Sequence, residues 1–360
     1  MRHSFAHRHL RLDTMNFLTN DAIDRIRRDY YSAVYFHRTK EVLLAEKNFT
    51  PVTMQIFQRN NDVLLCGAGE VVELLQQATG YWQGRKWVNC WKTLEVKTLT
   101  DGDTLRAKEP VLHITGPYVY FAHLESVYLG ILARRTLVAT NVRRAVDAAG
   151  GKPVMFFADR FDYFANQEGD GYAAHIGGAA GICTPAHRSW WNGKPVGTIP
   201  HALIAINNGD TVKAARQFVK HYPRVPLIVL VDYHNDCVRT ALDVANALGK
   251  RIWGMRLDTS QDMVDVSVAK TKEAGVTPEV VRMVRSALDS KGHNHVKIVV
   301  SGGFTAEKIM TFENAHVPVN VYGIGSWFLK GNNDFTADIV KVHGKPEAKV
   351  GRRFHAIHRS

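Results

Sequence analysis

The sequence has few cysteines, no long apolar run and no signal-like start. No stretch approaches the roughly 18–20 uninterrupted apolar residues that a membrane span needs. The first 13 residues are rich in His and Arg and contain no apolar segment of a secretory signal. No two cysteines form a Cys-x-x-Cys pair, which argues against a zinc ribbon or a dithiol redox site. These absences predict a protein of the reducing cytosol with no membrane partner. The four cysteines are Cys66, Cys90, Cys183 and Cys237.

Residues 1–14 are predicted to be an extension without a catalytic role, because a helical pattern begins just after Met15, a plausible alternative start. An Arg-rich targeting segment is the alternative interpretation of this stretch. Among the cysteines, Cys183 is a candidate nucleophile. The competing hypothesis for Cys183 is a buried, inert thiol, which is the commoner state of a free cysteine.

Acidic residues are under-represented relative to basic ones. The chain has 46 Lys and Arg against 34 Asp and Glu, and hence a formal net charge of +12. The basic residues are spread along the chain, and the clearest cluster in the second half is Gly351–His355. Nucleic-acid binding usually needs a contiguous basic stripe. The distribution therefore favours attraction of small polyanionic substrates over a nucleic-acid partner.

The first part of the chain mixes helices and strands without regular alternation. A helix is predicted from Asn20 to about Glu46, and a strand at Pro51–Phe57. A long helical stretch runs over 118–149 and ends at Gly150-Gly151. Further strands are predicted over 94–98 and 104–115. The pattern predicts an α+β, sandwich-like domain over residues 15–150.

The pattern changes after Gly151, where short apolar runs alternate with amphipathic helices. Repeated β-α units with nearly continuous apolar strands need a parallel sheet that is buried on both faces. About six units predict an incomplete, irregular TIM-like β/α barrel over residues 151–330. An open doubly wound sheet is the alternative. Residues 331–360 form a C-terminal tail that can pack back on the first domain. The predicted strands are 154–157, 202–206, 227–231, 252–257, 296–300 and 319–322, and the predicted helices include 211–222, 237–248, 278–290 and 306–315.

Polar residues follow the predicted strands, at the edge where parallel sheets carry their active sites. Arg256 and Asp258 alternate on one strand, so both side chains face the same side. The competing interpretations are local: each carboxylate could cap a following helix, and His201 could be a hydrogen-bonded loop residue. The candidates are Arg160, Asp232, Asp258, Ser301-Gly302-Gly303 and Gly323-Ile324-Gly325-Ser326 after strands, with His201 at the entry to the strand predicted over 202–206.

Two glycine turns follow consecutive predicted strands. Ser301-Gly302-Gly303 precedes Thr305, which has the character of a helix N-terminus. Glycines let backbone N–H groups approach an anion, and the helix dipole favours negative charge at that end. Gly323 to Ser326 supplies a second such turn. Two turns at neighbouring strand ends predict a phosphate site.

Five segments in order resemble the nicotinate phosphoribosyltransferases, within the type II phosphoribosyltransferases, over about Tyr30 to Phe328. The family joins nicotinate to the ribose of phosphoribosyl pyrophosphate, giving nicotinate mononucleotide and pyrophosphate. ATP hydrolysis through a phosphohistidine drives that reaction. The resemblance therefore implies phosphoribosyl pyrophosphate, nicotinate and ATP as partners, with Mg²⁺. The five segments are Glu109–Tyr118, Gly197–His201, Arg256–Ser260, Val300–Phe304 and Tyr322–Ser326.

The resemblance also implies a role for each matched residue. His201 would be phosphorylated, and Arg160 would bind the nicotinate carboxylate. Tyr35 matches a position that stacks on the pyridine ring across the interface of a homodimer. No tightly bound metal is implied, because Mg²⁺ would arrive with substrate on Asp232 or Asp258. The other implied contacts are Thr198, Arg256 and Asp258 to the phosphoribosyl substrate, Asp232 to the ribose hydroxyls, and Ser301, Gly302, Gly303, Gly323, Gly325 and Ser326 to the 5′-phosphate.

Three segments depart from the family pattern. Ala158 and Asp159 precede Arg160, Ala179-Ala180 follows a Gly-Gly step, and Thr259-Ser260-Gln261 replaces Ser-Gly-Asp. The departures lie mainly at the pyridine end. They leave open a quinolinate or nicotinamide phosphoribosyltransferase, or a non-catalytic ligand sensor on the same fold.

Overall fold

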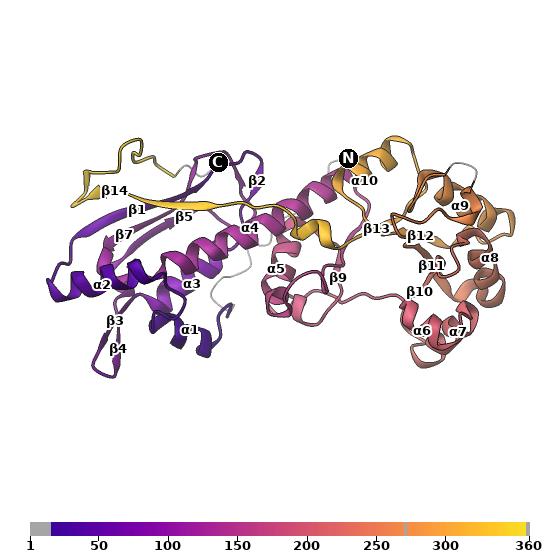
Figure 1. The fold of residues 1–360 in the computed structure, drawn as a ribbon, viewed down its shortest axis with the longest axis horizontal. Helices are drawn as coiled ribbons and strands as arrows, with labels where there is room; N and C mark the ends of the chain where they lie inside the picture. The colour runs from indigo at the N-terminus through magenta and orange to yellow at the C-terminus, as the bar shows by residue number, and fades with distance from the viewer. Residues whose placement is uncertain (1–15, 270–271, 358–360) are drawn as a thin grey trace. The chain divides into compact units, whose positions relative to one another are not determined.

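The computed structural model describes residues 16–269 and 272–357, and it forms two compact units (Figure 1). Unit 1 comprises Met1–Ala139 and Gly331–Ser360, and unit 2 comprises Thr140–Lys330. The change of unit falls inside a long helix, earlier than the predicted boundary at residue 150. The predicted extension over residues 1–14 lies outside the described residues. No helix in the described part of the chain is long and apolar enough to cross a membrane.

Unit 1 is built on an antiparallel five-stranded sheet of order β15-β14-β1-β7-β5. Side chains alternate across β1, so Val52, Met54 and Ile56 enter the hydrophobic core that helix α3 also lines. Its elements are α1 (Asn20–Arg27), α2 (Val34–Ala45), β1 (Pro51–Gln58), β2 (Val63–Leu64), α3 (Ala68–Ala78), β3 (Gly80–Gln83), β4 (Lys86–Asn89), β5 (Glu95–Thr98), β6 (Thr104–Leu105), β7 (Pro110–Pro117), the start of α4 (Glu125–Ala148), β14 (Phe335–Val342) and β15 (Lys345–Pro346).

The C-terminal segment belongs to unit 1. Strand β14 pairs with β1 along seven registered residues, and the two lie side by side in Figure 1. The chain then crosses the other face of the sheet. There the Gln55 amide donates to the Arg353 carbonyl oxygen at 3.2 Å, and the His355 backbone N–H donates to Gln55 at 2.9 Å. Gln55 is buried because the tail covers it.

Two helix predictions in unit 1 had the wrong extent. The helix predicted over 20–46 is two helices, α1 and α2, because Asp29 takes a left-handed φ of 59° that no helix interior allows. The stretch over 118–149 begins with two short 3₁₀ turns, and the α-helix starts only at Glu125. Helix α3, which is packed almost wholly inside the core, was not predicted.

Unit 2 is a curled, parallel six-stranded sheet of order β10-β11-β12-β13-β8-β9, which confirms the predicted irregular β/α barrel. Helices connect most successive strands, as parallel pairing requires. The elements are β8 (Val154–Phe156), α5 (Gln167–Gly177), β9 (Gly181–Ile182), α6 (His201–Ile206), α7 (Thr211–His221), β10 (Leu227–Leu230), α8 (Cys237–Leu248), β11 (Ile252–Leu257), α9 (Pro278–Ser290), β12 (Lys297–Val300), α10 (Ala306–Asn314) and β13 (Val321–Ile324).

A short extended segment bridges the two outer strands of this sheet. The Val196 N–H donates to the Ile182 carbonyl on β9 at 2.7 Å, and the Ile199 N–H donates to the Ile228 carbonyl on β10 at 3.2 Å. Segment 195–199 therefore occupies the gap that the six named strands leave, and its two backbone bonds continue the ring.

The strand predicted over 202–206 was wrong, because these residues form helix α6. A five-residue apolar run does not by itself distinguish a strand from a helix. Ile206 at its end is 80% exposed, so the run is no buried strand. As a result His201 follows the extended segment, where it was predicted to precede a strand.

The helices of unit 2 begin where the sequence places capping residues. Asp236 accepts from the Arg239 N–H, Thr277 from the Val280 N–H, and Thr305 from the Lys308 N–H. Helices α8 and α9 have the bounds predicted from the sequence. Helix α5 and strand β9 were missed; their Gly- and Ala-rich sequences carry little periodic signal.

Phe335 offers a test of how the C-terminal strand contributes to unit 1. Its side chain is 7% exposed and packs in the unit 1 core. We expect Phe335→Ala to lower the free energy of unfolding by about 3 kcal/mol, through lost burial and an unfilled cavity. Val350→Ala is the matched control in the same tail, since Val350 is 97% exposed, and should change stability by less than about 0.5 kcal/mol. Calorimetric melting of both variants measures the difference, and equal effects would contradict the placement.

Candidate functional site

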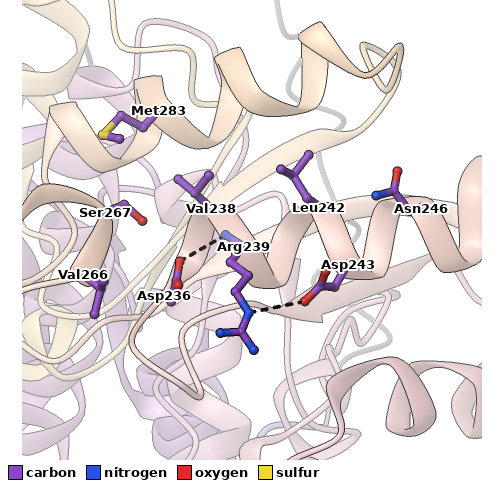
Figure 2. Close-up of a pocket in the computed structure, with 9 residues that line it drawn as sticks. All are labelled: Asp236, Val238, Arg239, Leu242, Asp243, Asn246, Val266, Ser267 and Met283. Carbon is purple, nitrogen blue, oxygen red and sulfur yellow. Dashed lines mark hydrogen bonds and ion pairs between the residues drawn. The ribbon is translucent and has the colours of Figure 1, made fainter.

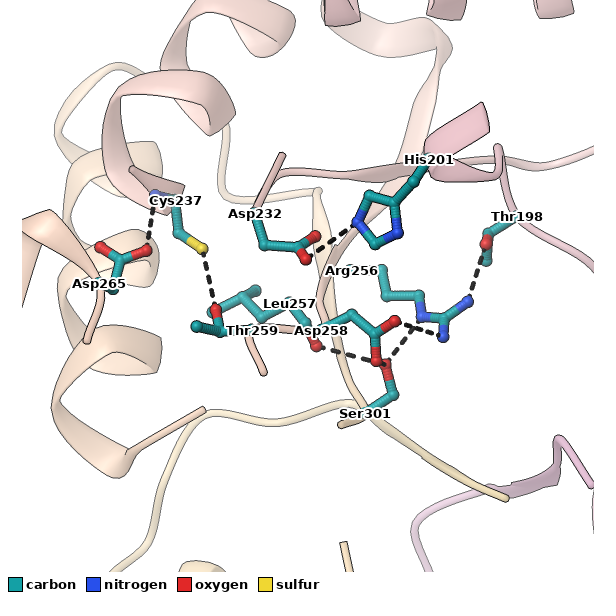
Figure 3. Close-up of polar contacts among 10 residues, drawn as sticks. All are labelled: Thr198, His201, Asp232, Cys237, Arg256, Leu257, Asp258, Thr259, Asp265 and Ser301. Atoms are coloured by element: carbon teal, nitrogen blue, oxygen red, sulfur yellow. Dashed lines mark hydrogen bonds and ion pairs between the residues drawn. The ribbon is translucent and has the colours of Figure 1, made fainter. Parts of the chain in front are cut away.

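Arg256 is the centre of a hydrogen-bonded cluster at the carboxyl ends of the unit 2 strands (Figure 3). Its Nε donates to Ser301 Oγ at 2.8 Å, its Nη1 to Thr198 Oγ1 at 3.0 Å and its Nη2 to Asp258 Oδ2 at 3.1 Å. The partners come from the loops after β11 and β12 and from segment 195–199. The structure thus brings four sequence-predicted residues together around one guanidinium group.

The Asp258 carboxylate belongs to this cluster and caps no helix. One oxygen accepts from Arg256, and the other accepts from Ser301 Oγ at 2.7 Å. The following α-helix in the chain, α9, is capped by Thr277. The side chains of Arg256 and Asp258 are each 17% exposed, so one edge of the pair remains open to a ligand.

Phe157 is a site residue that the sequence did not single out. Its ring lies under the Arg256 guanidinium, 5.0 Å from its central carbon, a distance typical of cation–π contact. The ring also fills the space next to Gly323, where a Cβ would come within 2.5 Å of it. The sequence indicated a role for Phe157 only indirectly, because the residue ends a predicted strand three residues before Arg160.

The first predicted phosphate turn is a tight one. Gly302 and Gly303 have φ values of 80° and 72°, which only glycine adopts without strain. Thr305 then caps α10, so the turn leads directly into a helix N-terminus. Gln261 reaches across from the loop after β11, and its amide donates to the Gly303 carbonyl oxygen at 3.1 Å.

The second predicted turn differs from the expectation. Gly323 lies within strand β13, so the turn begins only at Gly325. A Cβ on Gly325 would lie 2.3 Å from the ring of Phe161 and 2.8 Å from the Phe157 carbonyl oxygen. Ser326 opens a short 3₁₀ turn. Both glycines therefore allow the segment after β8 to pack closely against β13.

His201, the first residue of α6, pairs with Asp232 after β10. His201 Nε2 lies 3.0 Å from Asp232 Oδ2, and the side chains are 44% and 8% exposed. The hydrogen bond to Asp232 raises the pKa of His201 above its ordinary value, against the opposing effect of burial. The second carboxylate oxygen of Asp232 is buried and accepts no hydrogen bond from the described residues.

The two residues predicted for the pyridine ring lie in different units. Arg160 follows β8 in unit 2, is exposed, and lies 5.7 Å from the centre of the Phe161 ring. Tyr35 lies in the first turn of α2 in unit 1, is 65% exposed, and contacts the Phe36 ring at 4.2 Å.

The described residues include carboxylates but no preformed metal-binding site. Among residues 16–269 and 272–357, no three His, Cys, Asp or Glu side chains are grouped to hold a metal ion. Asp232 and Asp258 supply oxygen ligands, and the unpartnered oxygen of Asp232 is an acceptor without a donor. This set fits a Mg²⁺ ion that keeps several waters and is shared with a phosphate ligand.

A hollow of about 500 Å³ beside α8 contains none of the predicted site residues (Figure 2). Two of its lining contacts are internal: Asp236 accepts from the Arg239 N–H at 3.1 Å, and Arg239 Nε lies 3.8 Å from Asp243. Because the hollow contains none of the residues of the Arg256 cluster, we attribute no chemistry to it.

Comparison with known proteins relates both units to one class. Residues 33–136 match the model of the quinolinate phosphoribosyl transferase N-terminal domain. The crystal structure of a nicotinate-nucleotide pyrophosphorylase from Pyrococcus furiosus is 33% identical with a TM-score of 0.80, covering 94% of this chain and 81% of that one. The human nicotinic acid phosphoribosyltransferase structure has the same fold at 16% identity, with a TM-score of 0.69, covering 90% of this chain and 77% of that one.

A nicotinate phosphoribosyltransferase of Mycobacterium tuberculosis is 27% identical over 283 residues, which is 74% of this chain. The chain spans 59% of the length of that relative. A quinolinate-type N-terminal domain joined to a curled parallel sheet is the architecture of the type II phosphoribosyltransferases. Within that class, the chain belongs to the same family as the Pyrococcus furiosus nicotinate-nucleotide pyrophosphorylase, and its similarity to curated nicotinate phosphoribosyltransferases confirms the resemblance drawn from its five segments.

The His201–Asp232 pair predicts a measurable titration. We expect the His201 ring to titrate above the ordinary histidine pKa of 6.5, and Asp232→Asn to lower its pKa. The sign follows from linkage: the pair stabilises the fold below pH 6.5 and loses this contribution as pH rises through the raised pKa. NMR titration of the histidine ring carbons measures both values. An unchanged His201 pKa in the variant would contradict the pairing.

Proposed function

We propose that this protein transfers the phosphoribosyl group of phosphoribosyl pyrophosphate to nicotinate, releasing pyrophosphate and forming nicotinate mononucleotide for NAD synthesis. The Arg256 cluster is the observation that carries the proposal. It places a cation, a carboxylate and a glycine turn at neighbouring strand ends. Similarity to curated nicotinate phosphoribosyltransferases supports the choice of reaction.

Arg256 would bind the phosphoribosyl substrate with its remaining donors. A guanidinium group has five N–H donors, and three of them are used by Ser301, Thr198 and Asp258. The remaining two are held in a fixed direction by those bonds. A rigid fork of this kind suits phosphate oxygens and stabilises negative charge on a departing pyrophosphate.

The carboxylates would act on the ribose. Displacement at the anomeric carbon passes through a positively charged, oxocarbenium-like state, which nearby carboxylates stabilise. Asp258 faces the open edge of the cluster. The buried free oxygen of Asp232 can accept a ribose hydroxyl. Mg²⁺ bound with the substrate would neutralise pyrophosphate charge, and Asp232 and Asp258 are the residues that would hold it.

His201 would carry the phosphoryl group that couples the reaction to ATP. Because the Asp232 carboxylate only accepts, the ring nitrogen facing it, Nε2, must carry hydrogen. The lone pair of the neutral ring is then on Nδ1. The His201 side chain is 44% exposed, and Nδ1 is the ring nitrogen that Asp232 leaves without a partner. We infer that phosphorylation occurs at Nδ1.

Arg160 and Tyr35 would bind the pyridine, with Arg160 pairing with the carboxylate and Tyr35 stacking on the ring of a nicotinate bound by the partner subunit. Exposed aromatic side chains near each residue support a homodimer, because large exposed apolar groups often mark protein interfaces. In unit 1 these are Tyr30, Tyr31 and Tyr35, and in unit 2 they are Phe161, Tyr163 and Phe164.

A turnover assay with three pyridines tests the proposed reaction. Nicotinate, nicotinamide and quinolinate are each incubated with phosphoribosyl pyrophosphate and Mg²⁺, with and without ATP, and pyrophosphate is measured. We expect release that requires nicotinate and increases with ATP. Release with quinolinate alone would replace the proposed substrate. Tight binding of nicotinate without turnover would instead identify a ligand sensor.

His201→Ala should abolish the stimulation by ATP and leave the ATP-independent transfer measurable, because the phosphoryl acceptor is lost while the Arg256 cluster is intact. With the wild type, phosphorus NMR after incubation with ATP should show phosphate on Nδ1. Phosphorylation should become faster as pH rises through the raised pKa of His201, since only the neutral ring is nucleophilic. Phosphate on Nε2, or full ATP stimulation in the variant, would contradict this role.

Arg256→Lys should raise the KM for phosphoribosyl pyrophosphate by about tenfold or more, a loss of about 1.4 kcal/mol or more. Lysine keeps the charge but cannot hold Ser301, Thr198 and Asp258 together. Arg239→Lys is the matched control, since Arg239 is 79% exposed on α8. Steady-state kinetics with both variants separate the effect from a general loss of positive charge.

A further inference from the structure

The turn that carries Arg160 is fastened at the residue before it. Cys183, just after β9, donates its thiol to Asp159 Oδ1 at 3.1 Å. The Gln167 amide at the start of α5 donates to the Asp159 carbonyl oxygen at 2.9 Å. That carbonyl belongs to the peptide bond that leads into Arg160. Both the side chain and the backbone of Asp159 are therefore held from outside the turn.

Gln167 and Cys183, which contact Asp159, have further partners of their own. The Thr184 hydroxyl donates to the side-chain amide oxygen of Gln167, Oε1, at 2.9 Å and accepts from the His187 backbone N–H at 3.2 Å. His187 is fully buried, and its Nδ1 lies 3.7 Å from the Cys183 sulfur. The Cys183 sulfur thus lies between His187 Nδ1 and Asp159 Oδ1.

The Cys183 thiol is protonated when it donates its hydrogen bond to Asp159. Burial, together with the hydrogen bond to Asp159, raises the pKa of Cys183. A protonated thiol donates a hydrogen bond and is a poor nucleophile, since the thiolate is the reactive form. Neither of the sequence-based hypotheses for Cys183, a nucleophile or a buried inert thiol, describes this contact.

An aspartate beside an arginine in sequence competes for it only when the carboxylate turns toward the guanidinium group. Asp159 and Arg160 are adjacent, and opposite charges within about 4–6 Å attract strongly. Yet among the described residues no carboxylate forms an ion pair with Arg160, and one oxygen of Asp159 is occupied by Cys183. The observed partner of the Asp159 carboxylate is thus the Cys183 thiol, and the Arg160 guanidinium group contacts the Phe161 ring.

We propose that Cys183 is a positioning residue that holds Asp159 aside and so leaves Arg160 free to bind the carboxylate of a pyridine substrate. The inference rests on the proposed function, because it takes Arg160 as the carboxylate-binding group. It extends that function because it makes the affinity for the pyridine substrate depend on a thiol that contacts no substrate.

Titration calorimetry with nicotinate, with and without phosphoribosyl pyrophosphate, tests the positioning role of Cys183 directly, because it measures binding and needs no turnover. We expect Cys183→Ala to weaken nicotinate binding about tenfold, because the released carboxylate competes for Arg160. Cys183→Ser keeps a donor and should bind within about threefold of the wild type. In kinetics, the KM for nicotinate should rise in Cys183→Ala while kcat and the KM for phosphoribosyl pyrophosphate stay within about twofold.

The double variant Cys183→Ala with Asp159→Asn separates this role from simple packing. Removing the competing charge should restore nicotinate binding if Cys183 acts through Asp159. A defect that persists in the double variant, or affinities for both substrates that fall together, would overturn the proposal. Failure of the wild type to bind nicotinate would also overturn it. Binding by the wild type without turnover would reject only the transferase activity, and the variants would still decide the role of Cys183.

Alkylation by iodoacetamide gives an independent check of the contact. The other cysteines, Cys66, Cys90 and Cys237, are buried, whereas Cys183 is partly exposed. Asp159→Asn removes the charge that helps to raise the pKa of the thiol, so Cys183 should be alkylated several times faster at pH 8. An unchanged rate, followed by mass spectrometry of the Cys183 peptide, would contradict the proposed contact.

Discussion

A half-buried guanidinium group at the mouth of the barrel must be paired, and this requirement organises the candidate site. A cation taken out of water is costly unless donors and acceptors match around it. Arg256 meets the requirement with Ser301, Thr198 and Asp258, which come from three different segments. Thr198 matters most for the fold, because it lies in segment 195–199, which bridges β9 and β10. The Arg256–Thr198 hydrogen bond therefore joins the guanidinium group to the segment whose backbone bonds bridge β9 and β10.

Close packing of one aromatic ring connects the two ends of the site. Phe157 lies under Arg256 and fills the space that Gly323 leaves empty, and its own chain continues to Asp159 and Arg160. A larger residue at position 323 would displace the ring, and with it both the guanidinium group and the turn after β8. The site therefore requires glycine at position 323, because the Phe157 ring occupies the space that a side chain there would fill.

The sequence predicted those features that depend on residues close together in the chain. Helices α8 and α9 were predicted residue for residue, because their caps and apolar periodicity lie within the elements themselves. Residues 202–206 were predicted wrongly, since a short apolar run has no local property that excludes a helix. Segment 195–199 carries no strand pattern, and its pairing depends on Ile182 and Ile228, far along the chain. The strand ends that meet at Arg256 could be predicted from parallel topology, whereas Phe157 and the Cys183–Asp159 contact depend on tertiary packing.

These contacts differ in how substitution would affect them under the proposed function. The phosphate end consists of backbone turns and a guanidinium group whose partners hold one another, so a change at one residue disturbs several. The pyridine end depends on a single turn, in which Asp159 is held by Cys183 and Gln167. Exchanging Cys183 removes a partner of the Asp159 carboxylate, and exchanging Gln167 removes a partner of the Asp159 backbone carbonyl; neither residue contacts Ser301 or Asp258. The departures from the family pattern at Ala158 and Asp159 lie in this turn. Substitutions in this turn would therefore change the surroundings of Arg160 while Arg256 keeps its partners.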